Sequence, residues 1–284
     1  MKILDGKAVA EARRRQIKGR VADYRTRHPR APGLAVILVG EDPASQVYVG
    51  NKIKACQEVG IESFEHRLSA GTTAHQLKMV IDSLNANPLV DGILLQLPVP
   101  KHLPAEDAIN WISPQKDADC LTAENLGRLW TGQPLTTPCT PGGVMEILRF
   151  YNIDPSGKNA VVIGRSNIVG KPMAHLLMQA NATVTIAHSK TRNLREHLLR
   201  AELVVVAAGQ PEFLGAGDFA KDAVVVDVGI HRRPGADGKN RLCGDVRARE
   251  LDGIVQAITP VPGGVGPMTI TMLLENTLRL AEAR

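Results

Sequence analysis

Aromatic residues are scarce in this chain of 284 residues, and features of several special protein classes are lacking. Phe, Trp and Tyr make up 3% of the sequence, so the core must be built mainly from aliphatic side chains. No apolar run approaches the roughly 20 residues that a membrane-spanning helix needs. Asp5, Lys7 and Glu11 interrupt the N-terminal stretch, which therefore does not resemble a secretory signal. We expect a cytoplasmic protein without a membrane partner.

Cysteine and concentrated charge are also limited. The four cysteines form no CxxC pair and match no zinc-ligand spacing, so we expect buried free thiols and no metal site. The formal net charge is +5, but no block of Lys and Arg is interleaved with aromatic residues. This pattern argues against nucleic-acid binding, whereas a mildly basic chain suits an anionic cofactor or substrate.

The rest of the composition, 44% hydrophobic and 22% charged, is that of an ordinary globular protein with one large domain or two. Helical and strand-like segments alternate in the first half, which predicts an α/β domain with a parallel sheet. The run Leu34–Val39 is continuously apolar, as in a buried parallel strand. A helix is predicted from Pro43, with Asp42 as N-cap, to Gly60. Further helices are predicted at 7–27, 73–86 and 105–112, and further strands at 62–68 and 92–97.

The second half repeats the alternation after a connection, residues 113–141, that we expect to be irregular. Helices are predicted at about 137–151, from about 170 and at 268–282, and strands at 160–164, 182–187, 203–208, 223–229 and 253–258. We predict two α/β domains with parallel sheets. The first comprises residues 1–139, completed by a C-terminal helix (267–284) that returns to it, and the second is a Rossmann-like domain of residues 140–266.

The segment Val161–Pro172 predicts a dinucleotide site. It combines a buried strand, a glycine loop and a helix start, the setting in which a helix N-terminus binds pyrophosphate. Only Gly164 and Gly170 remain of the GxGxxG fingerprint, so a plain strand–helix turn is the alternative.

The residues after the next strand favour NADP over NAD. An NAD site usually has an acid here for the ribose hydroxyls, but this chain has His188, Ser189 and Lys190, with Arg165 in the preceding loop. A 2′-phosphate suits such positive charge. The alternative is that Lys190 lies in a solvated loop.

Three polar residues, Ser45, Tyr48 and Lys52, share one face of the helix that begins at Pro43. Lys52 lies at the border of the apolar stripe, where loss of solvent would lower its pKa into a range useful for proton transfer. The alternative is a lysine whose head group reaches solvent at the helix edge.

Two further polar residues lie where ligands of α/β proteins bind or in an adjoining loop. Gln96 ends a predicted parallel strand, and ligands bind at the carboxyl ends of such strands. Asp119 lies in the loop string KDAD. The alternative for Gln96 is a polar residue that only ends a strand, and the alternative for Asp119 is an acid in a solvated loop.

The string PGGVGPMT, Pro262 to Thr269, is the most distinctive in the chain, with three glycines and two prolines in eight residues. Such a segment predicts a rigid loop whose backbone can approach a ligand closely. A tight turn is the alternative.

Five ordered strings together resemble signatures of the methylenetetrahydrofolate dehydrogenase/cyclohydrolase family. They are SxxYxxxK (45–52), QLPVP (96–100), KDAD (116–119), GRSNIVGKP (164–172) and PGGVGPMT (262–269). The resemblance spans nearly the whole chain. It implies a bifunctional enzyme of one-carbon metabolism that oxidises 5,10-methylenetetrahydrofolate with NADP and then hydrolyses the methenyl product to 10-formyltetrahydrofolate. It also implies a homodimer formed through the cofactor domains.

The resemblance also implies roles for individual residues. Lys52 would be the catalytic lysine, Gln96 would hydrogen-bond both that lysine and the substrate, and Tyr48 would pack against the pterin. Asp119 would bind the pterin ring. Further substrate contacts would come from Ser45, Pro262, Gly263 and Gly264. Cofactor contacts would come from Gly164, Arg165, Ser166, Ile168, Gly170, His188, Ser189 and Ile230.

Two positions depart from the family pattern. Cys120 stands where the family usually has glycine after the pterin-binding acid, so the loop backbone there is expected to differ. His231 stands where asparagine is frequent. Neither position carries a group that does chemistry.

Three other functions remain open at this point: an NADP-dependent dehydrogenase of another small molecule, a non-catalytic NADP sensor, and a family member with dehydrogenase activity alone. The first leaves Asp119 and the 262–269 loop unexplained. The second has no use for Lys52, and the third has no use for Lys52 together with Gln96.

Overall fold

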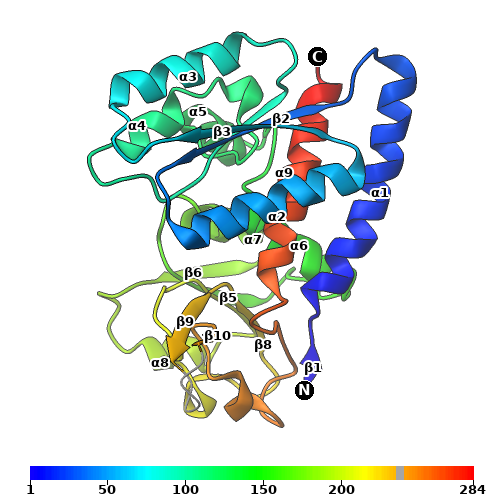
Figure 1. Ribbon diagram of the computed structural model, residues 1–284. Helices are drawn as coiled ribbons and strands as arrows, with labels where there is room; N and C mark the ends of the chain where they lie inside the picture. Colours follow the sequence, from blue (N-terminus) through cyan, green and yellow to red (C-terminus); the bar gives the residue numbers. More distant parts are fainter. Residues whose placement is uncertain (235–239) are drawn as a thin grey trace. The chain divides into compact units, whose positions relative to one another are not determined.

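The computed structural model describes residues 1–234 and 240–284, which form two compact units (Figure 1). One unit comprises residues 12–139 and 270–284, and the other comprises residues 1–11 and 140–269. Within the described residues, no helix combines the length and the apolar character that crossing a membrane requires.

The unit of residues 12–139 and 270–284 is built on a three-stranded parallel sheet. Its strands lie in the order β3 (Glu62–Leu68), β2 (Gly33–Val39) and β4 (Gly92–Leu95). All seven residues of β2 are buried, as expected for a central parallel strand. The helical segments of this unit are most of α1 (Gly6–Arg27), α2 (Pro43–Val59), α3 (Ala74–Ala86), α4 (Ala105–Asn110), η1 (Pro114–Lys116), α5 (Ala123–Trp130) and most of α9 (Val265–Glu282).

Helix α2 begins and ends as its sequence predicts. The Asp42 carboxylate accepts a hydrogen bond from the Ser45 amide at 2.7 Å, and Pro43 occupies the first turn. Gly60 ends the helix in the left-handed region, with φ of 85°. These two caps fix which residues of α2 face the sheet, and Val49 and Cys56 are fully buried there.

Apolar side chains of β2 and β4 pack against α3 and α4 to form a core on one face of this sheet. Its buried members are Ala35, Ile37, Val39, Leu77, Ile81, Leu84, Val90, Ile93, Leu95, Leu103, Ala108 and Ile112. The core is almost entirely aliphatic, as the scarcity of aromatic residues predicts. It holds the carboxyl ends of the strands, where Gln96 follows β4, in fixed positions.

The other unit contains a six-stranded parallel sheet with the order β1-β11-β8-β7-β5-β6. The strands are β1 (Lys2–Ile3), β5 (Asn159–Ile163), β6 (Thr183–Ala187), β7 (Leu203–Val206), β8 (Val224–Asp227) and β11 (Ala257–Ile258). The other segments of this unit are α6 (Cys139–Phe150), α7 (Gly170–Gln179), α8 (Leu194–Leu198), η2 (Ala216–Asp218), η3 (Ala248–Leu251) and the hairpin of β9 (His231–Pro234) and β10 (Asn240–Cys243). The predicted α/β class with parallel sheets is confirmed.

Several predicted segments were wrong. The connection 113–141 contains the helix α5, which is capped by Thr122. The predicted strand 253–258 shortens to β11, because turns occupy its first part. Helix α9 begins at Val265 rather than at 268, since a proline is tolerated in a first helical turn. Residues 1–11, placed with the first domain from sequence, contribute β1 to the six-stranded sheet.

Candidate active site

Lys52 and Gln96 form the centre of the candidate site in the unit of residues 12–139 and 270–284. The Gln96 amide continues the sheet ladder by donating to the Ile37 carbonyl, 2.9 Å away, so its side chain begins at a fixed point beyond β4. Lys52 Nζ donates to Gln96 Oε1 at 2.9 Å, and Gln96 Nε2 donates to the Leu97 carbonyl at 2.6 Å. The glutamine amide is therefore held at both ends, with its oxygen facing the lysine.

Burial changes the acid–base properties of Lys52. Its exposed fraction is 8%. Loss of hydration lowers the pKa of Lys52 below its ordinary value, and the negative charge of Asp119 opposes that shift. The buried thiols of Cys139 and Cys56 act on it in the same direction as Asp119, but more weakly. A neutral amine is therefore formed at lower pH than for an exposed lysine.

Asp119 lies close enough to Lys52 for their charges to interact. Burial raises the pKa of Asp119, whereas the Lys52 charge and a hydrogen bond with Cys139 lower it. Cys139 begins α6 and is itself buried, with the pKa of its thiol raised well above the usual value by burial. Sequence reasoning did not identify Cys139 as a neighbour of Asp119, because twenty residues separate them in the chain.

The loop that carries Asp119 is organised by the preceding acid, Asp117. Its carboxylate accepts hydrogen bonds from the amides of Leu121 and Thr122 and from the Asn125 side chain, at 2.8 to 3.1 Å. Cys120 adopts φ of 58°, in the left-handed region that favours glycine. The backbone at Cys120 thus has a conformation that glycine favours, although a cysteine is present. The cysteine is accommodated in this conformation, so it does not require the different loop backbone that was expected from the sequence.

The other two polar residues of α2 differ in exposure. Ser45 is buried, whereas Tyr48 has an exposed fraction of 36%. One helical turn separates Tyr48 from Lys52, so the two share a face of α2.

The glycine-rich loop of residues 262–264 belongs to the other unit, and so do the predicted cofactor residues. Gly263 has φ of 106°, and Gly6 at the start of α1 lies directly against the loop. A Cβ atom added to Gly6 would lie 1.8 Å from the Gly264 carbonyl oxygen. The loop is therefore held by a contact in which only glycine fits.

The loop between β5 and α7 has the close packing of a dinucleotide-binding turn. Gly164 has φ of 127°, and a Cβ atom there would lie 2.3 Å from the Ala207 carbonyl oxygen. A Cβ atom on Gly170 would lie 2.2 Å from the Gly164 carbonyl oxygen. The Ser166 hydroxyl accepts hydrogen bonds from the amides of Val169 and Gly170, which orders the start of α7. Ile168 is exposed at the tip of this loop.

Positive charge is available next to this loop. Arg165 and Lys190 are exposed, and within residues 1–234 and 240–284 neither forms an ion pair with a carboxylate. The segment after β6 is shaped by His188, whose amide donates to the Thr191 hydroxyl and whose Nδ1 accepts from the Lys190 amide. Ser189 is exposed in this turn. These residues fit a phosphorylated ribose, because cations and a hydroxyl are present where an NAD site has an acid.

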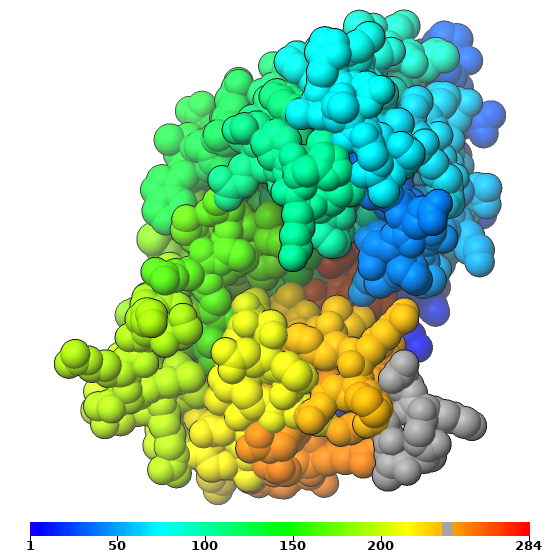
Figure 2. Space-filling view, turned by 60° about the vertical axis from the view of Figure 1, so that its left-hand side comes forward, coloured from blue at the N-terminus to red at the C-terminus, as the bar shows by residue number. Residues whose placement is uncertain are grey.

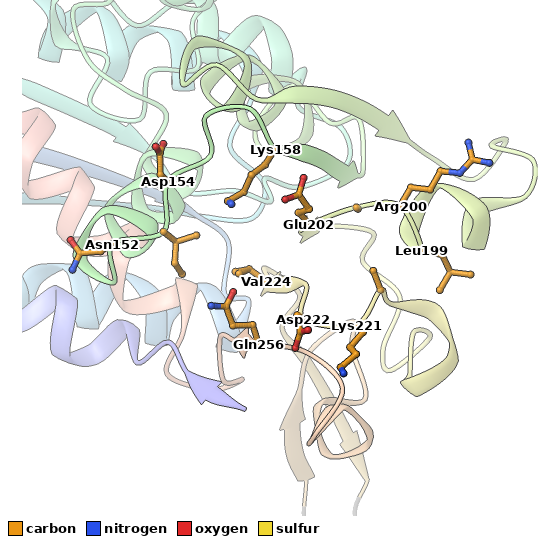
Figure 3. A pocket seen from close by; sticks show the side chains of 13 residues that line it. Asn152, Asp154, Lys158, Leu199, Arg200, Glu202, Lys221, Asp222, Val224 and Gln256 are labelled. Atoms are coloured by element: carbon orange, nitrogen blue, oxygen red, sulfur yellow. The ribbon is translucent and has the colours of Figure 1, made fainter.

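A cavity of about 530 Å³ lies at the opposite edge of the six-stranded sheet (Figure 3). Its lining includes Lys158, Glu202, Val224 and Gln256, which lie at or just before the amino-terminal ends of four strands. Its lining contains both cations and acids. The carboxyl edge, where parallel sheets bind ligands, is elsewhere, so this cavity is distinct from the candidate cofactor site.

Two buried acids, Asp227 and Asp245, lie at the carboxyl edge of the six-stranded sheet, and sequence reasoning missed Asp245. Asp227 ends β8, and Asp245 follows β10. Burial raises the pKa of Asp227 to about 6, although three backbone amides donate to its carboxylate and lower it. The string Gly244-Asp245-Val246 directly after a short strand was the available signal.

One unit has a buried lysine beside its parallel sheet, and the other has a glycine-bounded turn at the carboxyl edge of its sheet. These features define a dinucleotide-dependent enzyme with two α/β units. Family comparison makes this specific. The sequence matches "Tetrahydrofolate dehydrogenase/cyclohydrolase, catalytic domain" over residues 4–119 and the "NAD(P)-binding domain" of the same family over residues 138–284. The chain belongs to the tetrahydrofolate dehydrogenase/cyclohydrolase family.

Individual relatives agree over the full length. The bifunctional protein FolD of Bdellovibrio bacteriovorus is 56% identical over 99% of this chain and 97% of its own. The structure of the bifunctional enzyme FolD from Campylobacter jejuni has a TM-score of 0.94 and 44% identity, covering 100% of this chain and 99% of the other. The Trypanosoma brucei FolD structure, complexed with NADP cofactor and an inhibitor, has a TM-score of 0.94 and 38% identity, covering 99% and 97%. The predicted family and enzyme class are confirmed.

Proposed function

We propose that the unit of residues 12–139 and 270–284 holds a tetrahydrofolate and that the unit of residues 1–11 and 140–269 binds NADP. The chain would then oxidise 5,10-methylenetetrahydrofolate to the methenyl form and hydrolyse that product to 10-formyltetrahydrofolate. The observation that carries this proposal is the buried Lys52–Gln96 pair, 2.9 Å from Nζ to Oε1, with Asp119 beside it.

NADP would be held by the turn from Gly164 to Gly170 and by the segment after β6. Arg165 and Ser189 would bind the 2′-phosphate, and Ser166, Ile168, His188 and Ile230 would complete the contacts. When bound, NADP accepts the hydride that the methylene carbon loses. Support for NADP over NAD comes from the exposed cations and the missing acid after β6, and from the Trypanosoma brucei relative that binds NADP.

The folate would be oriented by residues of the unit of residues 12–139 and 270–284. Asp119 would accept hydrogen bonds from the N–H groups of the pterin, Tyr48 would cover the ring, and Ser45 would support this wall of the site. Pro262, Gly263 and Gly264 would supply rigid backbone contacts. Such positioning is the main requirement for hydride transfer, since the substrate nitrogens stabilise the cation that forms.

Hydrolysis needs a proton taken from water and later delivered to a folate nitrogen. Lys52 is proposed for both tasks, because burial lowers its pKa toward the range in which it can exchange protons. Gln96 orients the amine through its oxygen and is held by the Leu97 carbonyl. A member with dehydrogenase activity alone would not need this pair.

The proposal is tested by mixing the purified protein with 5,10-methylenetetrahydrofolate and either NADP or NAD, while absorbance follows reduced cofactor and the methenyl product. We expect turnover with NADP well above turnover with NAD, and little accumulation of the methenyl product. Accumulation of that product would leave only the dehydrogenase, and no turnover with either cofactor would contradict the proposal.

The oligomeric state and cellular location are further proposals. The family resemblance supports a homodimer formed through the NADP-binding units, and the composition supports a cytoplasmic enzyme. Sedimentation of the purified protein would give twice the chain mass of 30.6 kDa if the dimer forms. A single-chain mass at micromolar concentration would contradict it.

A further inference from the structure

Asp245 joins two segments at the carboxyl edge of the six-stranded sheet. Its side chain is fully buried. Oδ2 accepts hydrogen bonds from the amides of Ala208, at 2.7 Å, and Gly209, at 3.0 Å, directly after β7. Oδ1 accepts from His231 Nε2, at 2.7 Å, at the start of β9. Both carboxylate oxygens are thus used within the protein.

A second buried carboxylate fixes the backbone around Asp245. Asp227 Oδ1 accepts hydrogen bonds from the amides of Gly229, at 2.9 Å, and Asp245, at 3.0 Å, and Oδ2 accepts from the Val246 amide at 2.9 Å. A Cβ atom on Gly244 would lie 1.9 Å from Asp227 Oδ2, so glycine is needed for this approach. The two acids therefore form one connected network.

Ile230 lies between two residues that this network holds. The Gly229 amide donates to Asp227, and the His231 ring donates to Asp245. Neither acid binds the side chain of Ile230, and the residue has an exposed fraction of 47%. In Figure 2 parts of residues 203–234 and 240–258, coloured yellow to orange, are visible next to one another on the face shown. An exposed apolar side chain anchored on both sides is suited to contact a flat ligand.

We propose that His231, acting through Asp245, is a positioning residue for the dinucleotide: it fixes Ile230 and the 208–209 segment in the geometry that NADP needs. This inference rests on the proposed NADP site and adds a residue to it. His231 stands where the family frequently has asparagine, whose shorter amide could also donate to a carboxylate. Its ring is only partly exposed, with a side-chain fraction of 20%.

The test compares His231→Leu with wild type by calorimetric titration with NADP. Leucine has a similar size but no donor, so a buried carboxylate oxygen loses its side-chain partner. We expect the Kd for NADP to rise about tenfold, the change that a charged hydrogen bond of about 1.5 kcal/mol produces. His231→Asn should recover most of the affinity. Arg232→Leu, an exposed change on the same strand, is the matched control and should bind as wild type does.

A second readout separates positioning from general stability. Hydrolysis of 5,10-methenyltetrahydrofolate without NADP depends on Lys52 and Gln96, which lie in the other unit, so we expect His231→Leu to keep it. Should leucine impair folding, His231→Gln offers a polar replacement and the same comparison. If NADP affinity and hydrolysis fall together with thermal stability, His231 is merely structural and the inference is wrong. An unchanged Kd in His231→Leu also overturns it, whereas failure of wild type to bind NADP overturns the proposed function first.

Discussion

Lys52 illustrates how a single buried charge can serve chemistry at the expense of stability. The folded-state pKa of Lys52 is lowered, so between that pKa and the ordinary lysine value the unfolded chain binds more protons than the folded protein. The free energy of unfolding therefore rises with pH across that window, and at neutral pH the burial of this amine is a cost. The residue is retained at a position where an apolar side chain would fold better.

Replacing Lys52 by methionine tests that trade-off. We expect Lys52→Met to lower the rate of methenyltetrahydrofolate hydrolysis by about 100-fold or more, the usual effect of removing a general acid–base group. Its melting temperature should equal or exceed that of wild type, because no charge is left to desolvate. Stopped-flow hydrolysis and calorimetry measure the two effects. A variant that hydrolyses normally would contradict the role of Lys52.

The pH dependence of hydrolysis tests the pairing of Lys52 with Asp119. The Asp119 charge raises the pKa that burial lowers, so Asp119→Asn removes the opposing effect and lets the pKa of Lys52 fall further. The limb of the kcat/KM profile that reports deprotonation of Lys52 should move to lower pH. Asp154→Asn, a change in the other unit, is the control and should leave the profile in place. An unchanged limb in Asp119→Asn would show that the two groups do not interact.

Cys120 shows what a residue identity can and cannot predict. The sequence identified Asp119 beside it through the family resemblance, but it did not predict that Cys120 would adopt φ of 58° with its thiol donating to the Thr136 carbonyl at 3.3 Å. The backbone there is fixed by Asp117 and its three donors, which lie up to eight residues further along the chain. Side-chain contacts of this kind have no period or composition that a single sequence displays.

Replacing Cys120 by glycine weighs two opposing effects. Glycine removes the strain of a left-handed residue, about 1 kcal/mol, but it also removes a buried side chain and its hydrogen bond and adds freedom to the unfolded chain. We expect the free energy of unfolding to fall by about 1 kcal/mol, measured by urea denaturation. A clear increase would mean that backbone strain dominates.

At the scale of elements, prediction was best where local chemistry decides. The caps of α2 and the bounds of β3 follow from residues next to them in sequence, and both were predicted correctly. Strands β1 and β11 have only two residues each and exist because β1 pairs with β11 and β11 pairs with β8. Helix α5 was missed because proline, glycine and threonine around it obscured eight helical residues. The sequence therefore did not predict the short strand β1, which depends on a distant partner, or the helix α5, whose flanks resemble a loop.

The start of α1 provides a test of one close contact between elements. In Gly6→Ala the new methyl group would meet the Gly264 carbonyl, so the 262–264 loop must move. We expect the free energy of unfolding to fall by about 2 kcal/mol and the KM for the folate to rise. The matched control is Gly19→Ala in the same helix, where the added Cβ has no atom within 4 Å.

The control should behave in the opposite way to Gly6→Ala. Alanine is favoured over glycine inside a helix by about 1 kcal/mol, so Gly19→Ala should be more stable than wild type. Chemical denaturation and steady-state kinetics on both variants decide the matter. Equal stability of the two variants would show that the Gly6 contact does not constrain the loop.

At the scale of the whole molecule, the division into two units predicts that the two activities can be separated by mutation. Arg165→Gln removes a positive charge from the NADP-binding unit and nothing from the Lys52 site. We expect the KM for NADP to rise about tenfold while the KM for NAD changes little, because only NADP has the 2′-phosphate. Methenyltetrahydrofolate hydrolysis should be unaffected. Equal losses with both dinucleotides would contradict the role of Arg165.

The pairing of β1 with β11 has a consequence for the order in which the chain folds. Lys2 pairs with Ala257, so β1 finds its neighbour only after 257 − 2 = 255 further residues have been added. Contacts between such distant parts of a chain form slowly, because a long loop must close first. Strand β1 therefore waits, unpaired, while the residues up to β11 are synthesised, and this edge strand of the larger sheet is among the last to be added to it.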